Sequence, residues 1–200
     1  MSERIKTAIL FSGRGSNMQA LINAGQDNDY PAAIACVITD NPQASGITFA
    51  RESGVLCEII DPSRHTSKQA FEERLQDCLQ YCEVELICLA GFMRILSANF
   101  VAKWPGRIIN IHPSLLPDYK GLDTHARVLR NGDVETGCSV HYVDSGIDTG
   151  KIIAQKKVPV YPGDDVDGLA QRVRASEHGL YPATLAHVAH RLLHERAGNA

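Results

Sequence analysis

The sequence R-I-I-N-I-H-P-S-L-L-P, which begins at Arg107, carries the side chains best suited to chemistry. Its first five residues alternate and end in β-branched side chains, which predicts a strand. Pro113 bars the continuation of a central strand, so His112 is expected at the carboxyl end, where open α/β sheets bind ligands. Asn110 lies two residues earlier and therefore points to the same face. An amide donor beside an imidazolium can stabilise a developing negative oxygen.

A second polar junction follows later in the chain. The sequence S-V-H-Y-V-D-S-G-I-D-T-G predicts the end of a strand, with Asp144 and Asp148 in the loop behind it. A carboxylate that meets His112 would raise the pKa of the imidazole and could relay a proton. His141 lies within the strand, where we expect it to be packed or hydrogen-bonded. We therefore predict a site for oxyanion stabilisation and proton transfer, formed by Asn110, His112 and an acidic residue.

The turn S-G-R-G-S-N near the amino terminus could bind an anion. Gly13 and Gly15 permit a tight connection from a strand to a helix that Ser16 or Asn17 can cap, and the free N–H groups of such a helix attract anions. A dinucleotide fingerprint would need a third glycine where Met18 stands, and the Gly-Lys-Ser/Thr of a P-loop is absent. One small phosphate fits better than a pyrophosphate, although a turn without a ligand would have the same local sequence.

Several other reactive side chains have structural explanations. Asp40 stands where a dinucleotide fold would place a ribose-binding acid, but it also precedes Asn41-Pro42, and we favour a turn residue. The cysteines form no C-x-x-C pair and are expected to be reduced and mostly buried: Cys36, Cys57, Cys78, Cys82, Cys88 and Cys138. The last histidines share a helical stripe that we interpret as a surface feature without metal: His187, His190 and His194.

The expected elements alternate between strand and helix. Strands are predicted at 4–12, 32–39, 55–60, 85–90, 107–111, 136–143 and 151–160. Helices are predicted at 16–26, 45–53, 66–81 and 123–131, and in an amphipathic segment at 166–194 that is interrupted near Gly179 and Pro182. This order predicts an α/β fold, Rossmann-like, with a single open, mostly parallel twisted sheet and helices on both faces. Residues 1–200 should form one domain, with a phosphate-binding half at 1–105 and a catalytic half at 106–200.

Composition limits the possible partners. The 200 residues are 44% hydrophobic, enough for one substantial core, and the net charge of −3 offers no general attraction to nucleic acid or to an acidic membrane. No apolar run approaches the roughly 18 residues of a membrane-spanning helix, and the first apolar run is too short for a signal peptide. We expect a cytoplasmic monomer or homodimer that acts on small molecules, with no nucleic acid or membrane partner.

Four motifs together resemble a known family. G-R-G-S-N, A-G-F-M-R-I-L, N-I-H-P-S-L-L-P and the D-x-x-x-D-x-G loop occur in the order and spacing of the folate-dependent phosphoribosylglycinamide formyltransferase family, the glycinamide ribonucleotide transformylases. The likeness covers nearly the whole chain. It implies that the amine of 5-phosphoribosylglycinamide attacks the formyl carbon of the co-substrate 10-formyltetrahydrofolate, through a tetrahedral oxyanion and without a metal, in de novo purine biosynthesis.

The resemblance also implies roles for individual residues. His112 would donate the proton, Asn110 would bind the formyl oxygen, and Asp148 would raise the pKa of His112 and assist proton movement. The substrate-binding residues would be Gly15, Ser16, Asn17, Arg174 and Glu177. The folate-binding residues would be Lys68, Met93, Arg94, Ile95, Leu96 and Asp144.

Local sequence alone leaves some of these assignments open. Arg174 and Glu177 would otherwise pass as solvated helix charges, and the apolar residues from Met93 to Leu96 either line a pocket or pack beneath the next helix. Two alternative functions remain. A formyltetrahydrofolate hydrolase shares the N-x-H motif and the acidic loop but normally carries a further domain. A non-catalytic Rossmann nucleotide-binding module would explain the glycine turn and Asp40 alone.

Overall fold

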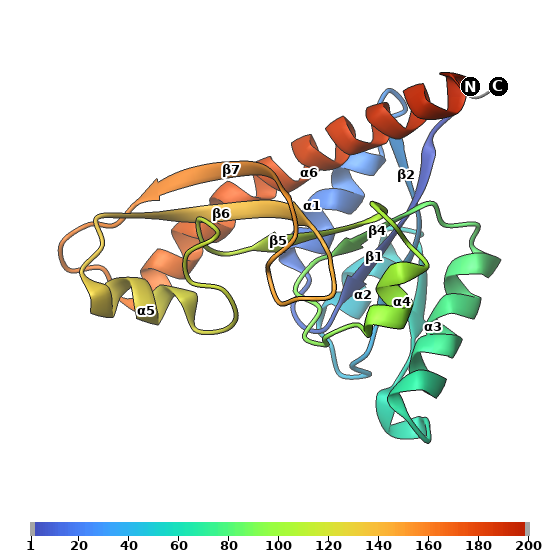
Figure 1. Cartoon of the computed structure of the whole chain (residues 1–200), viewed down its shortest axis with the longest axis horizontal. Helices are drawn as coiled ribbons and strands as arrows, with labels where there is room; N and C mark the ends of the chain where they lie inside the picture. Colours follow the sequence, from blue (N-terminus) through green and yellow to red (C-terminus); the bar gives the residue numbers. More distant parts are fainter. Residues whose placement is uncertain (1–2, 199–200) are drawn as a thin grey trace. The chain divides into compact units, whose positions relative to one another are not determined.

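The computed structural model describes residues 3–198 (Figure 1). They divide into two compact units. The first contains the described residues up to Leu96 and those from Leu185 onward, and the second is Ser97–Thr184.

The first unit contains a parallel sheet in the order β3-β2-β1-β4. Its strands are β1 (Ile5–Phe11), β2 (Ala32–Thr39), β3 (Leu56–Ile59) and β4 (Leu86–Leu89). Every residue of β1 except Lys6 is buried, as expected of a strand that is covered on both faces. The four strands lie within two residues of the predicted bounds.

Helices follow the strands of the first unit. They are α1 (Ser16–Gly25), α2 (Gly46–Glu52) and α3 (Lys68–Tyr81), with a short 3₁₀ turn η1 (Pro62–Arg64). α3 begins at a true cap, because the Ser67 hydroxyl accepts the Ala70 N–H at 3.1 Å. α1 does not, so the predicted cap at Ser16 or Asn17 is wrong. Gly15 is the cap, in a left-handed conformation with φ of 69° that glycine adopts without steric penalty.

The second unit contains an antiparallel sheet in the order β5-β6-β7. Its strands are β5 (Ile108–His112), β6 (Glu135–Tyr142) and β7 (Ile152–Pro159). Two short helices belong to it, α4 (Ala98–Ala102), which the Ser97 hydroxyl caps, and α5 (Thr124–Asn131), which ends at Gly132 as predicted. Four of the seven strands in the described residues form the parallel sheet of the first unit, and helices alternate with them. The predicted α/β class with a mostly parallel open sheet is confirmed.

The final helix differs from the prediction. α6 (Val166–Gly198) runs for 33 residues with Pro182 inside it, so the expected interruption near Gly179 and Pro182 is wrong. A proline removes one N–H donor and crowds the preceding turn, which disfavours a helix interior. The neighbouring Tyr181 and Leu185 side chains are both fully buried. Their packing outweighs the local preference, as tertiary contacts commonly do.

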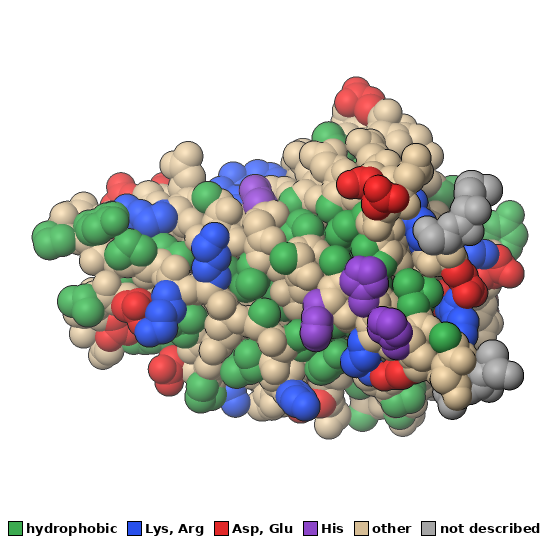
Figure 2. All heavy atoms as spheres, turned by 90° about the horizontal axis from the view of Figure 1, so that it is seen from above, with side chains coloured by type: hydrophobic (Ala, Val, Ile, Leu, Met, Phe, Trp, Pro, Cys, Tyr) green, Lys and Arg blue, Asp and Glu red, His purple; other side chains and the backbone are tan. Residues whose placement is uncertain are grey.

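The cysteines are free and mostly buried, and the last histidines lie on the surface, as predicted. All six cysteines are free thiols, four of them buried. Histidine side chains gather on one face of the protein (Figure 2), and α6 carries the exposed His187, His190 and His194. Between residues 3 and 198, no cluster of three or more histidine, cysteine or acidic side chains is arranged to hold a metal ion. None of the helices in this range combines the length and the apolar character that crossing a membrane requires.

Candidate active site

β5 sets the orientation of the two residues that the sequence first singled out. Ile109 and Ile111 are buried on one face of the strand, and alternation turns Asn110 and His112 to the other. A residue of α6 also holds the strand, because the buried Tyr181 hydroxyl donates a hydrogen bond to the Ile109 carbonyl at 3.1 Å. His112 is only 5% exposed. The predicted pair therefore stands on a rigid, buried element.

His112 faces an oxygen acceptor at each ring nitrogen. Nδ1 lies 3.2 Å from Asp148 Oδ2, and Nε2 lies 2.9 Å from the Tyr119 carbonyl oxygen. Burial lowers the pKa of His112, whereas the Tyr119 carbonyl and the Asp148 carboxylate raise it by a smaller amount. The expected meeting of carboxylate and imidazole is confirmed. The net pKa shift is downward and not upward, because burial destabilises the imidazolium more than the two acceptors stabilise it.

Asp148 is held by groups on three sides. Its Oδ2 also accepts the Gly121 N–H at 2.9 Å, and its Oδ1 lies 3.4 Å from His141 Nε2. Burial raises the pKa of Asp148, but the hydrogen bonds from His141 and Gly121 and the positive charge of His112 together bring this pKa below its usual value. The residue has a φ of 51°, a rare backbone conformation outside glycine. Such a conformation persists where the surroundings determine it.

His141 connects Asn110 to this carboxylate. Asn110 and His141 are direct partners in the β5·β6 ladder, and Asn110 Nδ2 lies 3.1 Å from His141 Nε2. His141 Nδ1 lies 2.8 Å from the Tyr142 carbonyl, so the expectation of a hydrogen-bonded histidine is confirmed. Its place in the site was missed. The alternation in C-S-V-H indicates that Ser139 and His141 share one face of β6, but only the β5·β6 register places them opposite His112 and Asn110.

α6 contributes charged residues to the second unit. Glu177 is 7% exposed, so its interpretation as a solvated helix charge is wrong, whereas Arg174 is half-buried. Burial and then the Arg174 charge lower the pKa of His125. Carboxylates are seldom buried, so burial distinguishes Glu177 from a charge on a solvated helix face.

The glycine turn of the first unit has the form that anion binding requires. Gly15 precedes α1 with a positive φ, and Ser16 and Asn17 form the first turn of the helix. A side chain on Gly15 would come within 2.7 Å of the Met18 terminal methyl carbon. Glycine is therefore favoured there chiefly by the backbone conformation.

Arg94 makes an ion pair that the sequence did not predict. Its Nε donates to Asp40 Oδ2 at 2.7 Å, and its guanidinium lies 5.7 Å from the centre of the Phe71 ring. Asp40 follows β2 as a turn residue, as we favoured, but its side chain is buried against this arginine. The ion pair fixes the segment that carries Met93 and Ile95.

The remaining folate candidates differ in exposure. Met93 and Ile95 are 67% and 62% exposed, which leaves two large apolar side chains open to a ligand, whereas Leu96 is buried in the core. Lys68 is exposed, with its Nζ 4.0 Å from Glu72 Oε1. Asp144 Oδ1 accepts the Thr149 hydroxyl at 2.6 Å and the Gly146 N–H at 3.0 Å. This side chain stabilises its own loop.

Comparison with known proteins identifies the family. Residues 5–185 match the model of the formyl transferase family. The chain belongs to this family. The formyl transferase is 42% identical over 178 residues to "Phosphoribosylglycinamide formyltransferase" of Escherichia coli (strain K12), an alignment that covers 89% of this chain and 84% of that protein.

Solved structures agree with this assignment. The formyl transferase has a TM-score of 0.91 to a phosphoribosylglycinamide formyltransferase from Brucella melitensis, with 44% identity and coverage of 94% of this chain and 96% of that one. The TM-score to glycinamide ribonucleotide transformylase 1 from Symbiobacterium toebii is 0.92, with 39% identity over 95% and 90% of the two chains. This chain is also 45% identical, over 185 residues, to the "Trifunctional purine biosynthetic protein adenosine-3" of Drosophila melanogaster. The chain spans only 14% of that protein's length.

Proposed function

We propose that this formyl transferase moves the formyl group of 10-formyltetrahydrofolate to the amine of 5-phosphoribosylglycinamide, a step of de novo purine biosynthesis. The observation that carries the proposal is the buried cluster at the end of β5, where His112 faces Asp148 and Asn110 faces His141. An amide donor and a protonatable imidazole on one strand face suit a reaction that develops negative charge on a carbonyl oxygen. Relatives of similar length carry the name of this activity.

The proposed reaction begins with the substrate amine. Its lone pair attacks the formyl carbon, and the carbonyl electron pair moves to the oxygen, which Asn110 and protonated His112 stabilise by donating hydrogen bonds. The bond between the formyl carbon and N10 of the folate then breaks. N10 takes up one proton through His112, and the attacking amine gives up one, so the transfer consumes no net proton.

Asp148 supports His112 in this scheme. As a carboxylate with a lowered pKa it remains charged at neutral pH, and it favours the imidazolium form of the buried ring. His141 Nε2 lies 3.4 Å from the second carboxylate oxygen and 3.1 Å from the Asn110 amide nitrogen. The four side chains thus restrict one another's orientation, as preorganised electrostatic stabilisation requires.

Binding roles complete the proposal. We assign the substrate phosphate to the turn at Gly15, Ser16 and Asn17, and its ribonucleotide to Arg174 and Glu177. The folate co-substrate would contact Lys68, Met93, Arg94, Ile95 and the loop that begins at Asp144, and the buried Leu96 would anchor the apolar segment of this site. The exposed apolar side chains beside the fixed arginine suit a flat, partly apolar ligand with acidic groups. We infer one cytoplasmic domain over 1–200, with halves 1–105 and 106–200, that acts as a monomer or homodimer.

A steady-state assay tests this function. The purified protein is incubated with 5-phosphoribosylglycinamide and 10-formyltetrahydrofolate, each omitted in turn, while tetrahydrofolate and the formylated ribonucleotide are measured. Product that requires both compounds supports the transferase. Formate released without the ribonucleotide would instead indicate a hydrolase, and tight binding of a nicotinamide dinucleotide without turnover would indicate a binding module.

A further inference from the structure

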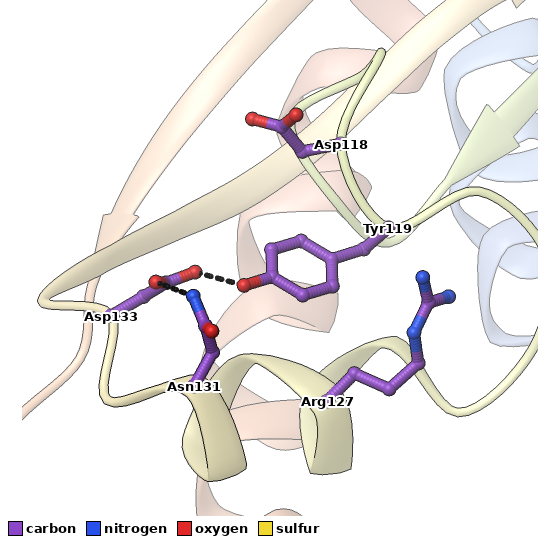
Figure 3. A pocket seen from close by; sticks show the side chains of 5 residues that line it. All are labelled: Asp118, Tyr119, Arg127, Asn131 and Asp133. Carbon is purple, nitrogen blue, oxygen red and sulfur yellow. Dashed lines mark hydrogen bonds between the residues drawn. The ribbon is translucent and has the colours of Figure 1, made fainter.

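A polar cavity of about 350 Å³ lies in the second unit, beside the site and apart from the side chains assigned to chemistry (Figure 3). It is lined by Asp118, Tyr119, Arg127, Asn131 and Asp133. Its polar groups contact one another. The Tyr119 hydroxyl donates to Asp133 Oδ2, Asn131 Nδ2 donates to Asp133 Oδ1 at 2.7 Å, and the Arg127 guanidinium lies 5.3 Å from the centre of the Tyr119 ring. These contacts fix the Tyr119 side chain at both its ring and its hydroxyl.

The backbone of Tyr119 points the other way, to the site. Its carbonyl oxygen lies 2.9 Å from His112 Nε2. Tyr119 has a φ of 53°, in the left-handed region that disfavours a residue with a bulky side chain. Without support, the peptide would relax and the carbonyl would turn away from the imidazole.

The backbone on either side of Tyr119 is restrained as well. The Ser114 hydroxyl donates to the Asp118 carbonyl at 2.6 Å, and Arg127 Nη1 donates to the Lys120 carbonyl at 2.7 Å. Gly121, two residues further on, donates its N–H to Asp148 at 2.9 Å. One short loop therefore supplies an acceptor to His112 and a donor to its carboxylate partner.

We propose that Tyr119 is a positioning residue for His112, and that Asp133 and Arg127 hold the Tyr119 carbonyl on the imidazole Nε2. The inference rests on the proposed function only in that His112 exchanges the proton. The carbonyl both orients the ring and stabilises its protonated form by accepting Nε2–H. The Tyr119 hydroxyl, on the far side of the residue, thereby controls proton exchange without touching the imidazole.

Other charged groups around His112 also affect its pKa, and the effect of the Tyr119 carbonyl must be compared with theirs. Asp148, from the loop after β6, favours the imidazolium. His141 on β6, together with Arg127 and His125 on α5, opposes a further positive charge, as does burial. The Tyr119 carbonyl is thus one of two groups that favour protonation against several that do not. Its displacement should lower the pKa of His112 and weaken ring orientation together.

Tyr119→Phe tests the proposal, because it removes the hydroxyl and keeps the ring, the carbonyl and the charge of the site. The pKa of His112 is measured by NMR titration of the substrate-free protein, with the resonance assigned by its absence in His112→Asn. We expect the pKa to fall by about half a unit or more. In the formyl-transfer assay, kcat should fall about three- to tenfold while KM changes less than about twofold.

Tyr161→Phe is the matched control. Tyr161 is an exposed tyrosine that, like Tyr119, has an arginine over its ring: Arg172 lies 4.6 Å from the ring centre, and the Tyr161 carbonyl accepts the Asp164 N–H. The Tyr161→Phe substitution should leave the His112 titration and kcat unchanged. A Tyr119→Phe protein that is folded, as judged by its thermal transition, and titrates as wild type would overturn the proposal.

Asp133 provides a second test if Tyr119→Phe fails to fold. Asp133→Ala removes the acceptor of the Tyr119 hydroxyl and should shift the His112 titration downward. Asp133→Asn keeps an acceptor oxygen and should restore most of the shift. Equal shifts in both variants would contradict the proposal, because charge and not anchoring would then be responsible. The titration needs no substrate and therefore tests the role of Tyr119 independently of the reaction. A wild-type protein that transfers no formyl group would refute the proposed function, but the His112 titrations of the variants could still be interpreted.

Discussion

His112 shows how one buried side chain can be tuned from opposite directions. Burial disfavours its charged form, while the Asp148 carboxylate and the Tyr119 carbonyl favour it. A group with a pKa near the working pH exchanges protons most effectively, so a balance of this kind suits an acid–base catalyst. Changes at His112 and its two acceptors should therefore alter both turnover and the titration of the imidazole.

Replacing His112 by Ala should lower kcat by about 10²- to 10⁴-fold, because proton donation and part of the oxyanion stabilisation are lost. Substrate KM should stay within about twofold, since the ring acts on the reacting atoms. Steady-state kinetics measure both, with His190→Ala, an exposed histidine on α6, as control. Turnover near the wild-type rate would remove His112 from the mechanism.

Asp148→Asn should lower the pKa of His112. The neutral amide no longer stabilises the imidazolium, while burial continues to oppose it. The limb of the pH profile of kcat/KM that reports His112 should consequently move to lower pH. An unchanged profile, with kcat also unchanged, would mean that Asp148 has only a structural role.

The residues that sequence reasoning found and missed differ in one respect. Residue type and a position near the end of a strand are enough to indicate Asn110, His112 and Asp148. His141 joins them only through the β5·β6 register, which the sequence does not specify directly. Tyr119 contributes a main-chain carbonyl, which is independent of side-chain type and thus gives no sequence signal. Glu177 was singled out only by the family resemblance, because its burial depends on packing that the local sequence does not show.

At the element scale, turn residues decide where the functional loops lie. The predicted strands and most helices agree with the structure to within about two residues, because apolar periodicity and glycine positions are local signals. The interruption of α6 was wrong because tertiary packing keeps the helix intact across Pro182. Gly150 closes the loop that carries Asp148, and its surroundings leave no room for a side chain.

Gly150→Ala should displace that loop. An added Cβ would lie 1.7 Å from the Tyr142 carbonyl oxygen, so the backbone must shift and Asp148 must move away from His112. We expect kcat to fall by about tenfold or more, in line with the loss of a precisely held group. Assays and the His112 titration would show both effects, and full activity would contradict this account of the loop.

Gly179→Ala is the matched control for a glycine with free space. Apart from the neighbouring residues and backbone of the helix itself, nothing lies within 4 Å of the added Cβ, and the residue is in the interior of α6. Alanine should stabilise the protein by about 0.5–1 kcal/mol, because it loses less backbone entropy in a helix. Denaturant unfolding measures this difference, and kcat should remain at the wild-type value. A destabilised variant would refute this assessment of the site.

At the scale of the whole molecule, the question is which nucleophile takes the formyl group. The four motifs identified the family only in combination, since each of them alone also has a structural explanation. Family members named as phosphoribosylglycinamide formyltransferases align over most of their length with this chain. The His112 side chain and the Asp148 side chain are only 6% and 12% exposed, which restricts water at the proton-exchanging pair.

A single-turnover experiment distinguishes amine from water most directly. Enzyme in excess is mixed with 5-phosphoribosylglycinamide and 10-formyltetrahydrofolate that carries ¹³C in the formyl group, and the label is followed by NMR. We expect the label to pass to the formamide carbon of the ribonucleotide, with one tetrahydrofolate released for each product formed. Label recovered as formate, or retained on the folate while the ribonucleotide is present, would contradict this expectation.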